Sequence, residues 1–154
     1  MTKTVVVVGL GYVGLPVALE SCERGFEVIG LDISKDLIND LNRYVSHVDD
    51  IEDSEIEKMF DHGFTVTDKP DSVKNADYTV ICVPTPLSDD GTPDMKAVIE
   101  ACEMIAPFIK KGSLVSLEST TYPGTTDGLV RRKLENDSGL IAGEDFALVY
   151  SPER

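Results

Sequence analysis

Three glycines near the start of the chain have the spacing of a phosphate-binding turn. Gly9, Gly11 and Gly14 form a G-x-G-x-x-G pattern directly after the apolar run 5–8, which is four valines. In such a turn the first glycine allows the tight passage from strand to helix, the second lets the backbone approach a pyrophosphate, and the third lets helix and strand pack closely. The following helix N-terminus directs free N–H groups and its positive dipole end at the anion, so the site needs no lysine.

A lone acid, Asp32, closes a second apolar run, eighteen residues after Gly14. A carboxylate at this place accepts hydrogen bonds from both hydroxyls of an adenosine ribose, and its charge repels a 2′-phosphate. The pattern therefore predicts a site for NAD rather than NADP. The alternative is an ordinary glycine-rich turn with a surface aspartate, and the strand before and the acid after disfavour it. The predicted cofactor-binding residues of this region are Gly9, Leu10, Gly11, Tyr12, Val13, Gly14 and Asp32.

The elements that must hold these residues alternate between strands and helices. Apolar runs predict six strands, at 5–8, 26–32, 64–67, 77–83, 113–117 and 146–150. Helical spacing and capping residues predict helices at about 12–24, 34–43, 54–62, 94–110 and 124–135, with Ser34, Ser54 and Asp94 as N-caps. We expect an α/β doubly wound fold, a mostly parallel six-stranded sheet (Rossmann fold) with helices on both faces.

The loops after the strands are expected to form one site, because ligands of such sheets bind beyond the carboxyl ends of the strands. These loops hold the unusual residues of the sequence. Besides the glycine-rich turn and Asp32, they are 84–86 (Pro-Thr-Pro), 118–124 (Glu-Ser-Thr-Thr-Tyr-Pro-Gly) and 151–154 (Ser-Pro-Glu-Arg).

The composition indicates one acidic domain. The chain has 154 residues and a formal net charge of −14, which opposes binding to nucleic acid or to an anionic membrane surface. Six of the nine residues 49–57 are acidic, which favours a solvated loop leading into a helix over a cation site. Apolar runs are too short for a signal peptide or a membrane span, so we expect a cytoplasmic protein.

The cysteines and histidines do not have the spacing of a metal site, and none is predicted. Cys22, Cys82 and Cys102 are far apart and fall on apolar helix faces or in a strand, so they are expected to be core residues in a reducing compartment rather than catalytic thiols. His47 and His62 stand in polar stretches and are expected at the surface.

Four motifs in order resemble the N-terminal NAD-binding domain of the UDP-sugar 6-dehydrogenases. The resemblance covers the whole chain, through 8–16 (Val-Gly-Leu-Gly-Tyr-Val-Gly-Leu-Pro), 82–87 with 91–94, 118–126 and 150–154. The runs 117–126 and 151–154 resemble the branch that acts on UDP-N-acetylhexosamines more than the UDP-glucose branch. The resemblance implies oxidation of the sugar C6 alcohol to a carboxylate in two steps, through a cysteine thiohemiacetal and a thioester, with two NAD+ per turnover.

The resemblance also implies roles for residues that match the motifs. Thr120 would position the catalytic water and the nicotinamide side of the site. Val83, Pro84, Thr85 and Ser119 would line the cofactor; loop capping is the alternative for Thr85 and Ser119. Glu153 matches a glutamate near the substrate and would do acid/base work or position water, with a solvated carboxylate as the alternative.

Two features depart from the family pattern. Leu37 stands where many members carry a basic residue, with Lys35 nearby. The chain also ends at Arg154, so the family's later lysine and asparagine, its nucleophilic cysteine, its central dimerisation helix and its UDP-sugar domain are not in the sequence. We therefore expect residues 1–154 to form one NAD-binding domain that binds NAD without oxidising a nucleotide sugar, and a homodimeric parent.

Two other functions remain as alternatives. One is a free-standing NAD-binding regulatory module of the kind that gates transport proteins, which would have no use for Thr120 or 151–154. The other is a different Rossmann dehydrogenase, such as a 3-hydroxyacid enzyme, against which the proline-rich loop 84–93 argues.

Overall fold

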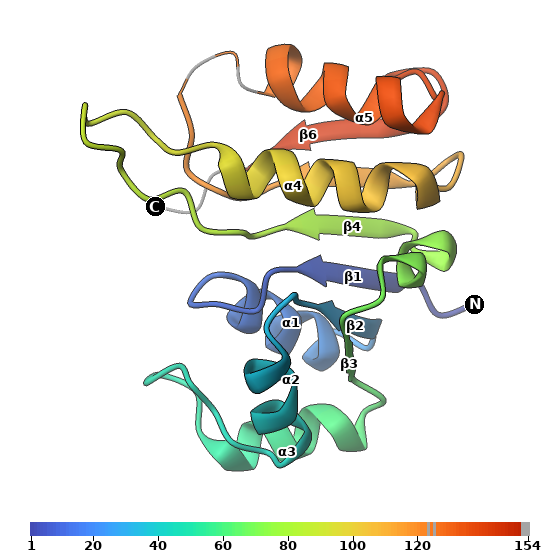
Figure 1. The fold of residues 1–154 in the computed structure, drawn as a ribbon. Helices are drawn as coiled ribbons and strands as arrows, with labels where there is room; N and C mark the ends of the chain where they lie inside the picture. The colour runs from blue at the N-terminus through green and yellow to red at the C-terminus, as the bar shows by residue number, and fades with distance from the viewer. Residues whose placement is uncertain (123, 125, 152–154) are drawn as a thin grey trace.

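The computed structural model describes residues 1–122, 124 and 126–151 and contains one six-stranded sheet, whose arrangement Figure 1 shows. The strand order is β3-β2-β1-β4-β5-β6, and all five pairings are parallel. The strands are β1 (Thr4–Val8), β2 (Glu27–Leu31), β3 (Thr65–Thr67), β4 (Tyr78–Ile81), β5 (Leu114–Leu117) and β6 (Ala147–Tyr150). The predicted doubly wound sheet is confirmed.

Helices cover both faces of the sheet, as predicted. They are α1 (Gly14–Glu23), α2 (Lys35–Asn42), α3 (Asp53–Asp61), α4 (Lys96–Ile105) and α5 (Arg131–Ser138), with short 3₁₀ segments at Pro70–Asn75 and Ala106–Phe108. No helix among the described residues is both long and apolar enough to cross a membrane.

The valines of β1 explain why this strand is apolar without interruption. Side chains alternate between the faces of a strand, so Val5 and Val7 pack with α1 and α3 in one core, while Val6 and Val8 pack with α4 and α5 in the other. All four are 5% exposed or less. A central parallel strand with helices on both sides has no solvent face, and this places the following glycine-rich turn between two rigid layers.

Helix starts agree with the sequence at α2 and differ at α3. Ser34 caps α2 as predicted, since its Oγ accepts from Leu37 N at 3.3 Å. The N-cap of α3 is Glu52 rather than the predicted Ser54, because Glu52 and Glu55 form a capping box in which Glu55 Oε2 accepts from Glu52 N at 2.8 Å. These acids of segment 49–57 therefore stabilise the start of a helix. This agrees with the sequence, which favoured a loop leading into a helix over a cation site.

Three predicted helices differ from the observed ones in their boundaries. The first helix begins at Gly14 rather than residue 12. The fourth begins at Lys96 with Met95 as its N-cap rather than the predicted Asp94, although Asp94 Oδ1 does accept a hydrogen bond from Lys96 N at 2.9 Å. The segment predicted as a helix over 124–135 is a π-helical turn, Thr126–Val130, followed by α5, which ends at Gly139 with φ 72°.

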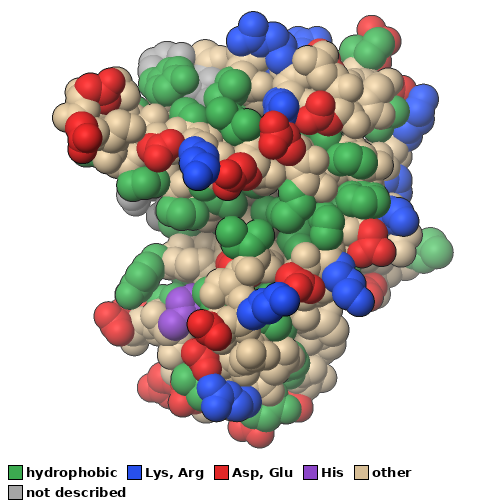
Figure 2. Space-filling view, in the orientation of Figure 1, with side chains coloured by type: hydrophobic (Ala, Val, Ile, Leu, Met, Phe, Trp, Pro, Cys, Tyr) green, Lys and Arg blue, Asp and Glu red, His purple; other side chains and the backbone are tan. Residues whose placement is uncertain are grey.

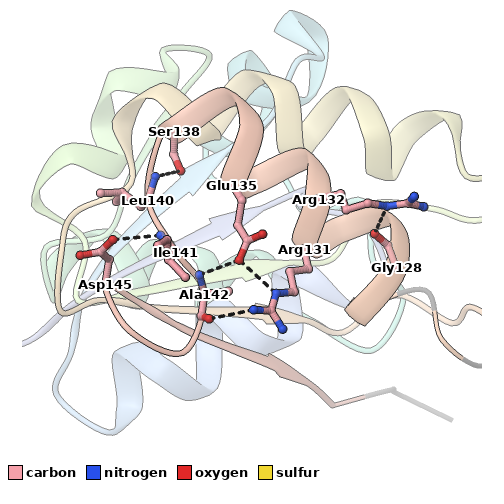
Figure 3. Close-up of polar contacts among 9 residues, drawn as sticks. All are labelled: Gly128, Arg131, Arg132, Glu135, Ser138, Leu140, Ile141, Ala142 and Asp145. Atoms are coloured by element: carbon pink, nitrogen blue, oxygen red, sulfur yellow. Dashed lines mark hydrogen bonds and ion pairs between the residues drawn. The ribbon is translucent and has the colours of Figure 1, made fainter.

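Charged side chains close the connection from α5 to β6 (Figure 3). Glu135 Oε1 accepts from Arg131 Nε and from Ala142 N, both at 3.0 Å, and Arg131 donates to Ala142 O at 3.3 Å. Asp145 accepts from Ile141 N at 2.9 Å. These bonds hold the turn that returns the chain to the edge strand β6.

Candidate dinucleotide-binding site

The loops after β1, β2, β4 and β5 meet at the carboxyl edge of the sheet. In Figure 1 the strand arrows point to one side, and Figure 2 shows the surface hollowed on that side. Two adjoining cavities, of about 360 and 300 Å³, lie there. Their shared lining is Gly11, Cys82, Val83 and Pro84. The cavities therefore form one cleft across the centre of the sheet edge, where the strand order reverses direction from β1.

The glycine-rich turn forms the centre of this cleft, and each of its glycines meets a different requirement. Gly9 has φ 89°, a conformation that side chains other than glycine rarely adopt. A Cβ on Gly14 would lie 1.7 Å from Gly9 O, so α1 packs against the turn too closely for any side chain. A Cβ on Gly11 would have no atom within 4 Å. The space at Gly11 is part of the cleft, which fits the close approach of a pyrophosphate.

Asp32 connects the end of β2 to this turn. Its Oδ2 accepts from Leu10 N and its Oδ1 from Ser34 N, each at 2.9 Å. A carboxylate offers about four acceptor positions, so two remain for ribose hydroxyls. The Leu10 side chain is fully buried and packs over Gly30, where a Cβ would lie 2.6 Å from a Leu10 methyl carbon. Leu10 therefore anchors the turn in the core.

The first cavity, beside Asp32, is apolar. It is lined by Ile33 and Leu37 on one side and by Ala97, Ala101 and Met104 of α4 on the other. Hydrophobic side chains gather between α2 and α4 in Figure 2. Ile33 is 78% exposed, which is unusual for an isoleucine and fits a surface that a flat adenine ring covers. The described residues that line this cavity include no lysine or arginine to pair with a 2′-phosphate.

The second cavity lies between the loops after β4 and β5, and two hydroxyls connect those loops. Thr85 Oγ1 donates to Thr120 O and Ser119 Oγ donates to Val83 O, each at 2.6 Å. These two bonds join separate loops rather than cap a residue's own loop, and both residues line the cavity. Thr120 is exposed and lines the same cavity, as do Tyr12 and Val13.

Comparison with known proteins identifies the family. Residues 3–154 match the NAD binding domain of the UDP-glucose/GDP-mannose dehydrogenase family. The chain belongs to this family. It is 39% identical over 152 residues to UDP-N-acetyl-D-mannosamine dehydrogenase of Pyrococcus horikoshii, covering 97% of this chain and 36% of that protein. It is 37% identical over 150 residues to UDP-N-acetyl-D-glucosamine 6-dehydrogenase of Pseudomonas aeruginosa, covering 97% and 35%.

Solved structures of family members have the same fold. The UDP-N-acetyl-D-mannosamine dehydrogenase of Pyrococcus horikoshii superposes with a TM-score of 0.92 at 38% identity, over 99% of this chain and 36% of that one. A ternary complex of GDP-mannose dehydrogenase from Pseudomonas aeruginosa also has a TM-score of 0.92, at 31% identity, over 99% and 36%. The chain thus spans about a third of the length of these dehydrogenases and is their NAD-binding N-terminal domain.

The cysteines of this dehydrogenase domain are core residues, as predicted. Cys22, Cys82 and Cys102 are buried and unpaired. Burial raises the pKa of the Cys82 thiol to about 12, and the nearby Glu118 charge adds to the shift. Cys82 lies beneath both cavities, yet its thiol stays protonated at neutral pH and is a poor nucleophile.

Two residues at or beside the cleft were not among the predicted cofactor-binding or catalytic residues. His47, expected at the surface, is partly exposed, and its Nε2 lies 2.6 Å from Leu10 O, a contact that the sequence did not predict. Glu118 lines the second cavity and accepts from Ser116 Oγ at 2.5 Å. A charge directly after a buried strand, as at Asp32, was the available signal for Glu118, whereas no sequence pattern marks His47. The predicted residue Glu153 lies outside the described residues.

Proposed function

We propose that a protein of the relatives' full length carrying this chain is an NAD-dependent UDP-sugar 6-dehydrogenase. Its substrate would be a UDP-N-acetylhexosamine, whose C6 alcohol is oxidised to a carboxylate with two NAD+ per turnover. The observation that carries the proposal is the two-part cleft, which places Asp32 in an apolar slot at one end and Thr120 at the other, with the open backbone of Gly11 between them.

The chain's own residues would hold the cofactor in an extended form. Asp32 would accept hydrogen bonds from the ribose hydroxyls, and the backbone around Gly11 would face the pyrophosphate. Val83 and Pro84, which line both cavities, would lie under the middle of the cofactor. The bound NAD+ supplies a hydride acceptor. Since Asp32 is negative and no cation lines the described part of the first cavity, NAD+ is expected to bind better than NADP+.

The loop after β5 would face the reacting end of the cofactor. Thr120 would position water there, and the bond from Thr85 to Thr120 O would hold the loop in place. Glu153 would act as acid/base or orient water during thioester hydrolysis. The nucleophilic cysteine would come from another domain, because the three cysteines here are buried. We therefore expect residues 1–154 to bind NAD without oxidising a nucleotide sugar.

The cysteines and the net charge also bear on the location and partners of the protein. We propose a cytoplasmic protein, which three unpaired cysteines fit because thiols persist in reducing compartments. The net charge of −14 argues against nucleic acid and anionic membranes as partners. A homodimer is proposed for the full-length protein.

Two measurements test the function. Calorimetric titration of the 154-residue chain should show binding of NAD+ and at least tenfold weaker binding of NADP+, a difference of about 1.4 kcal/mol. The full-length protein should produce NADH, followed by its absorbance, with UDP-N-acetylmannosamine or UDP-N-acetylglucosamine in preference to UDP-glucose or GDP-mannose. Equal affinity for the two cofactors would contradict the role of Asp32. NADH produced by the 154-residue chain alone would contradict the proposal that oxidation requires a cysteine from another domain.

A further inference from the structure

His47 contacts the glycine-rich turn from a distant part of the chain. It lies between α2 and α3, in the segment that also contributes the buried residues Val48 and Ile51 to the core around Leu10. Its Nε2 is 2.6 Å from Leu10 O, 37 residues away in sequence. Because a carbonyl only accepts, Nε2 must carry the hydrogen. The other ring nitrogen, Nδ1, is buried and has no partner within the described structure, so the Leu10 carbonyl alone selects the tautomer.

The bond to Leu10 O also fixes the orientation of the Gly11 N–H. The Leu10 C=O and the Gly11 N–H belong to one planar trans peptide, in which the two groups point in opposite directions. Holding the carbonyl toward His47 therefore directs the Gly11 N–H away from His47. None of the hydrogen bonds found among the described residues uses that N–H, while Gly11 lines both cavities. Glycine has the widest range of backbone conformations, so the Leu10–Gly11 peptide is easily reoriented. A bond from a distant side chain such as His47 can therefore fix its orientation.

Asp32 holds the preceding peptide. Its Oδ2 accepts from Leu10 N at 2.9 Å, so the two peptide groups that flank the Leu10 Cα are each held by a side chain. The Leu10 side chain is also fully buried. The turn is thus preorganised before any ligand arrives, which lowers the entropy that binding must remove.

We propose that His47 is a positioning residue of the cofactor site, which orients the Gly11 N–H toward the pyrophosphate through its bond to Leu10 O. The inference rests on the proposed binding of NAD in this cleft and assigns a role to a residue outside the glycine-rich motif. It predicts that His47 matters for ligands with a pyrophosphate and not for ligands without one.

The test compares NAD+ with adenosine, which keeps the adenine and ribose contacts and lacks the pyrophosphate. In His47→Leu the donor is lost, and the Kd for NAD+ should rise about five- to tenfold while the Kd for adenosine stays the same. In His47→Gln the amide nitrogen reaches the place of Nε2, and NAD+ affinity should return to within about threefold of the original value. His47→Asn, whose amide reaches only the place of Nδ1, should bind as weakly as His47→Leu.

His62 provides a matched control, because it also has a ring nitrogen 2.6 Å from a backbone carbonyl, that of Lys58, but is exposed at the C-cap of α3 and lines neither cavity of the cleft. His62→Leu should leave both dissociation constants unchanged. Thermal unfolding identifies any variant that does not fold, in which case the comparison of His47→Gln with His47→Asn decides.

Three results would overturn the inference. They are an unchanged NAD+ affinity in His47→Leu, an equal loss for NAD+ and adenosine, and a His47→Gln variant as weak as His47→Asn. A wild-type chain that binds no NAD+ would instead refute the proposed cofactor site itself, and the inference with it.

Discussion

The glycine-rich turn illustrates how residues of one type serve different physical ends. Gly14 is required by packing, since any Cβ would overlap Gly9 O. Gly9 is required by its backbone conformation, with φ 89°. Gly11 has neither constraint, since its φ is not positive and the space beside it is open. The structure itself therefore does not require a glycine at this position, and under the proposed function the pyrophosphate does.

This difference predicts opposite behaviour for two alanine variants. Gly14→Ala should lower the free energy of unfolding by at least about 1–3 kcal/mol, because the methyl group forces helix α1 off the turn. Gly11→Ala should unfold at nearly the wild-type temperature and yet raise the Kd for NAD+ at least about tenfold, because the methyl group occupies the approach to the pyrophosphate. Thermal unfolding and calorimetric titration measure the two effects. A stable Gly14→Ala chain, or a Gly11→Ala chain with full affinity, would contradict this account.

At the scale of elements, the edge of the sheet opposite the cleft is held by one carboxylate. Asp77, just before β4, accepts from Thr4 N at 3.0 Å and from Lys110 Nζ at 3.1 Å, and pairs with Lys3 at 3.5 Å. It thereby joins the start of β1 to the connection between α4 and β5. The bond from Thr4 N, followed by that from Lys110, lowers the pKa of Asp77 below its ordinary value.

The lowered pKa predicts a pH dependence of stability. Between the folded and unfolded pKa values the unfolded chain binds the extra proton, so the contribution of Asp77 is fully present above the ordinary value of 3.8 and is lost as the pH falls through the lower folded value. Asp77→Asn should therefore unfold at a lower temperature than wild type at pH 7, and the difference should shrink in acid. Asp90, whose pKa is lowered by bonds to Thr92 within its own turn, gives the control Asp90→Asn, with a smaller effect on global unfolding. A difference in unfolding temperature between Asp77→Asn and wild type that stays constant from pH 7 to below 3.8 would contradict the stabilising role of the Asp77 carboxylate.

At the scale of the whole molecule, negative charge dominates the surface. The chain carries 28 acidic and 14 basic side chains, and acidic side chains are spread over the face in Figure 2. The ion pairs are mostly between exposed side chains, such as Arg24 with Glu20 and Lys96 with Glu100, and contribute little each. We therefore expect repulsion among the excess acidic side chains to exceed the attraction within these pairs.

Salt should for this reason stabilise the protein. Raising NaCl from 0.01 to 0.15 M shortens the Debye length from about 30 to 8 Å and screens the repulsion, so the unfolding temperature should rise. Choline chloride at equal ionic strength should act equally if screening is the cause. A rise with sodium alone would indicate a bound cation, and a fall with either salt would show that the ion pairs outweigh the net charge.

Local patterns in the sequence were sufficient for most of the fold and for the proposed adenosine side of the site. The apolar runs predicted all six strands, most clearly β1, because a central parallel strand covered on both faces is apolar along its length. The glycine spacing and Asp32 predicted residues that the fold does bring to one cavity, because the residues of a strand–turn–helix unit are close in sequence. Helix boundaries were predicted less accurately than the strands. For example, α3 begins with the Glu52–Glu55 capping box rather than at Ser54, because several neighbouring polar residues can each act as an N-cap.

The sequence by itself thus determined the doubly wound sheet, the glycine-rich turn and the acid that faces it, all of which follow from short-range spacing. Only the tertiary structure decided how the turn and the loops are held. The bonds from His47 to Leu10, from Thr85 to Thr120 and from Ser119 to Val83 join residues 37, 35 and 36 positions apart. Such partners have no spacing rule, because they meet only after the strands have aligned and brought their carboxyl ends to one edge.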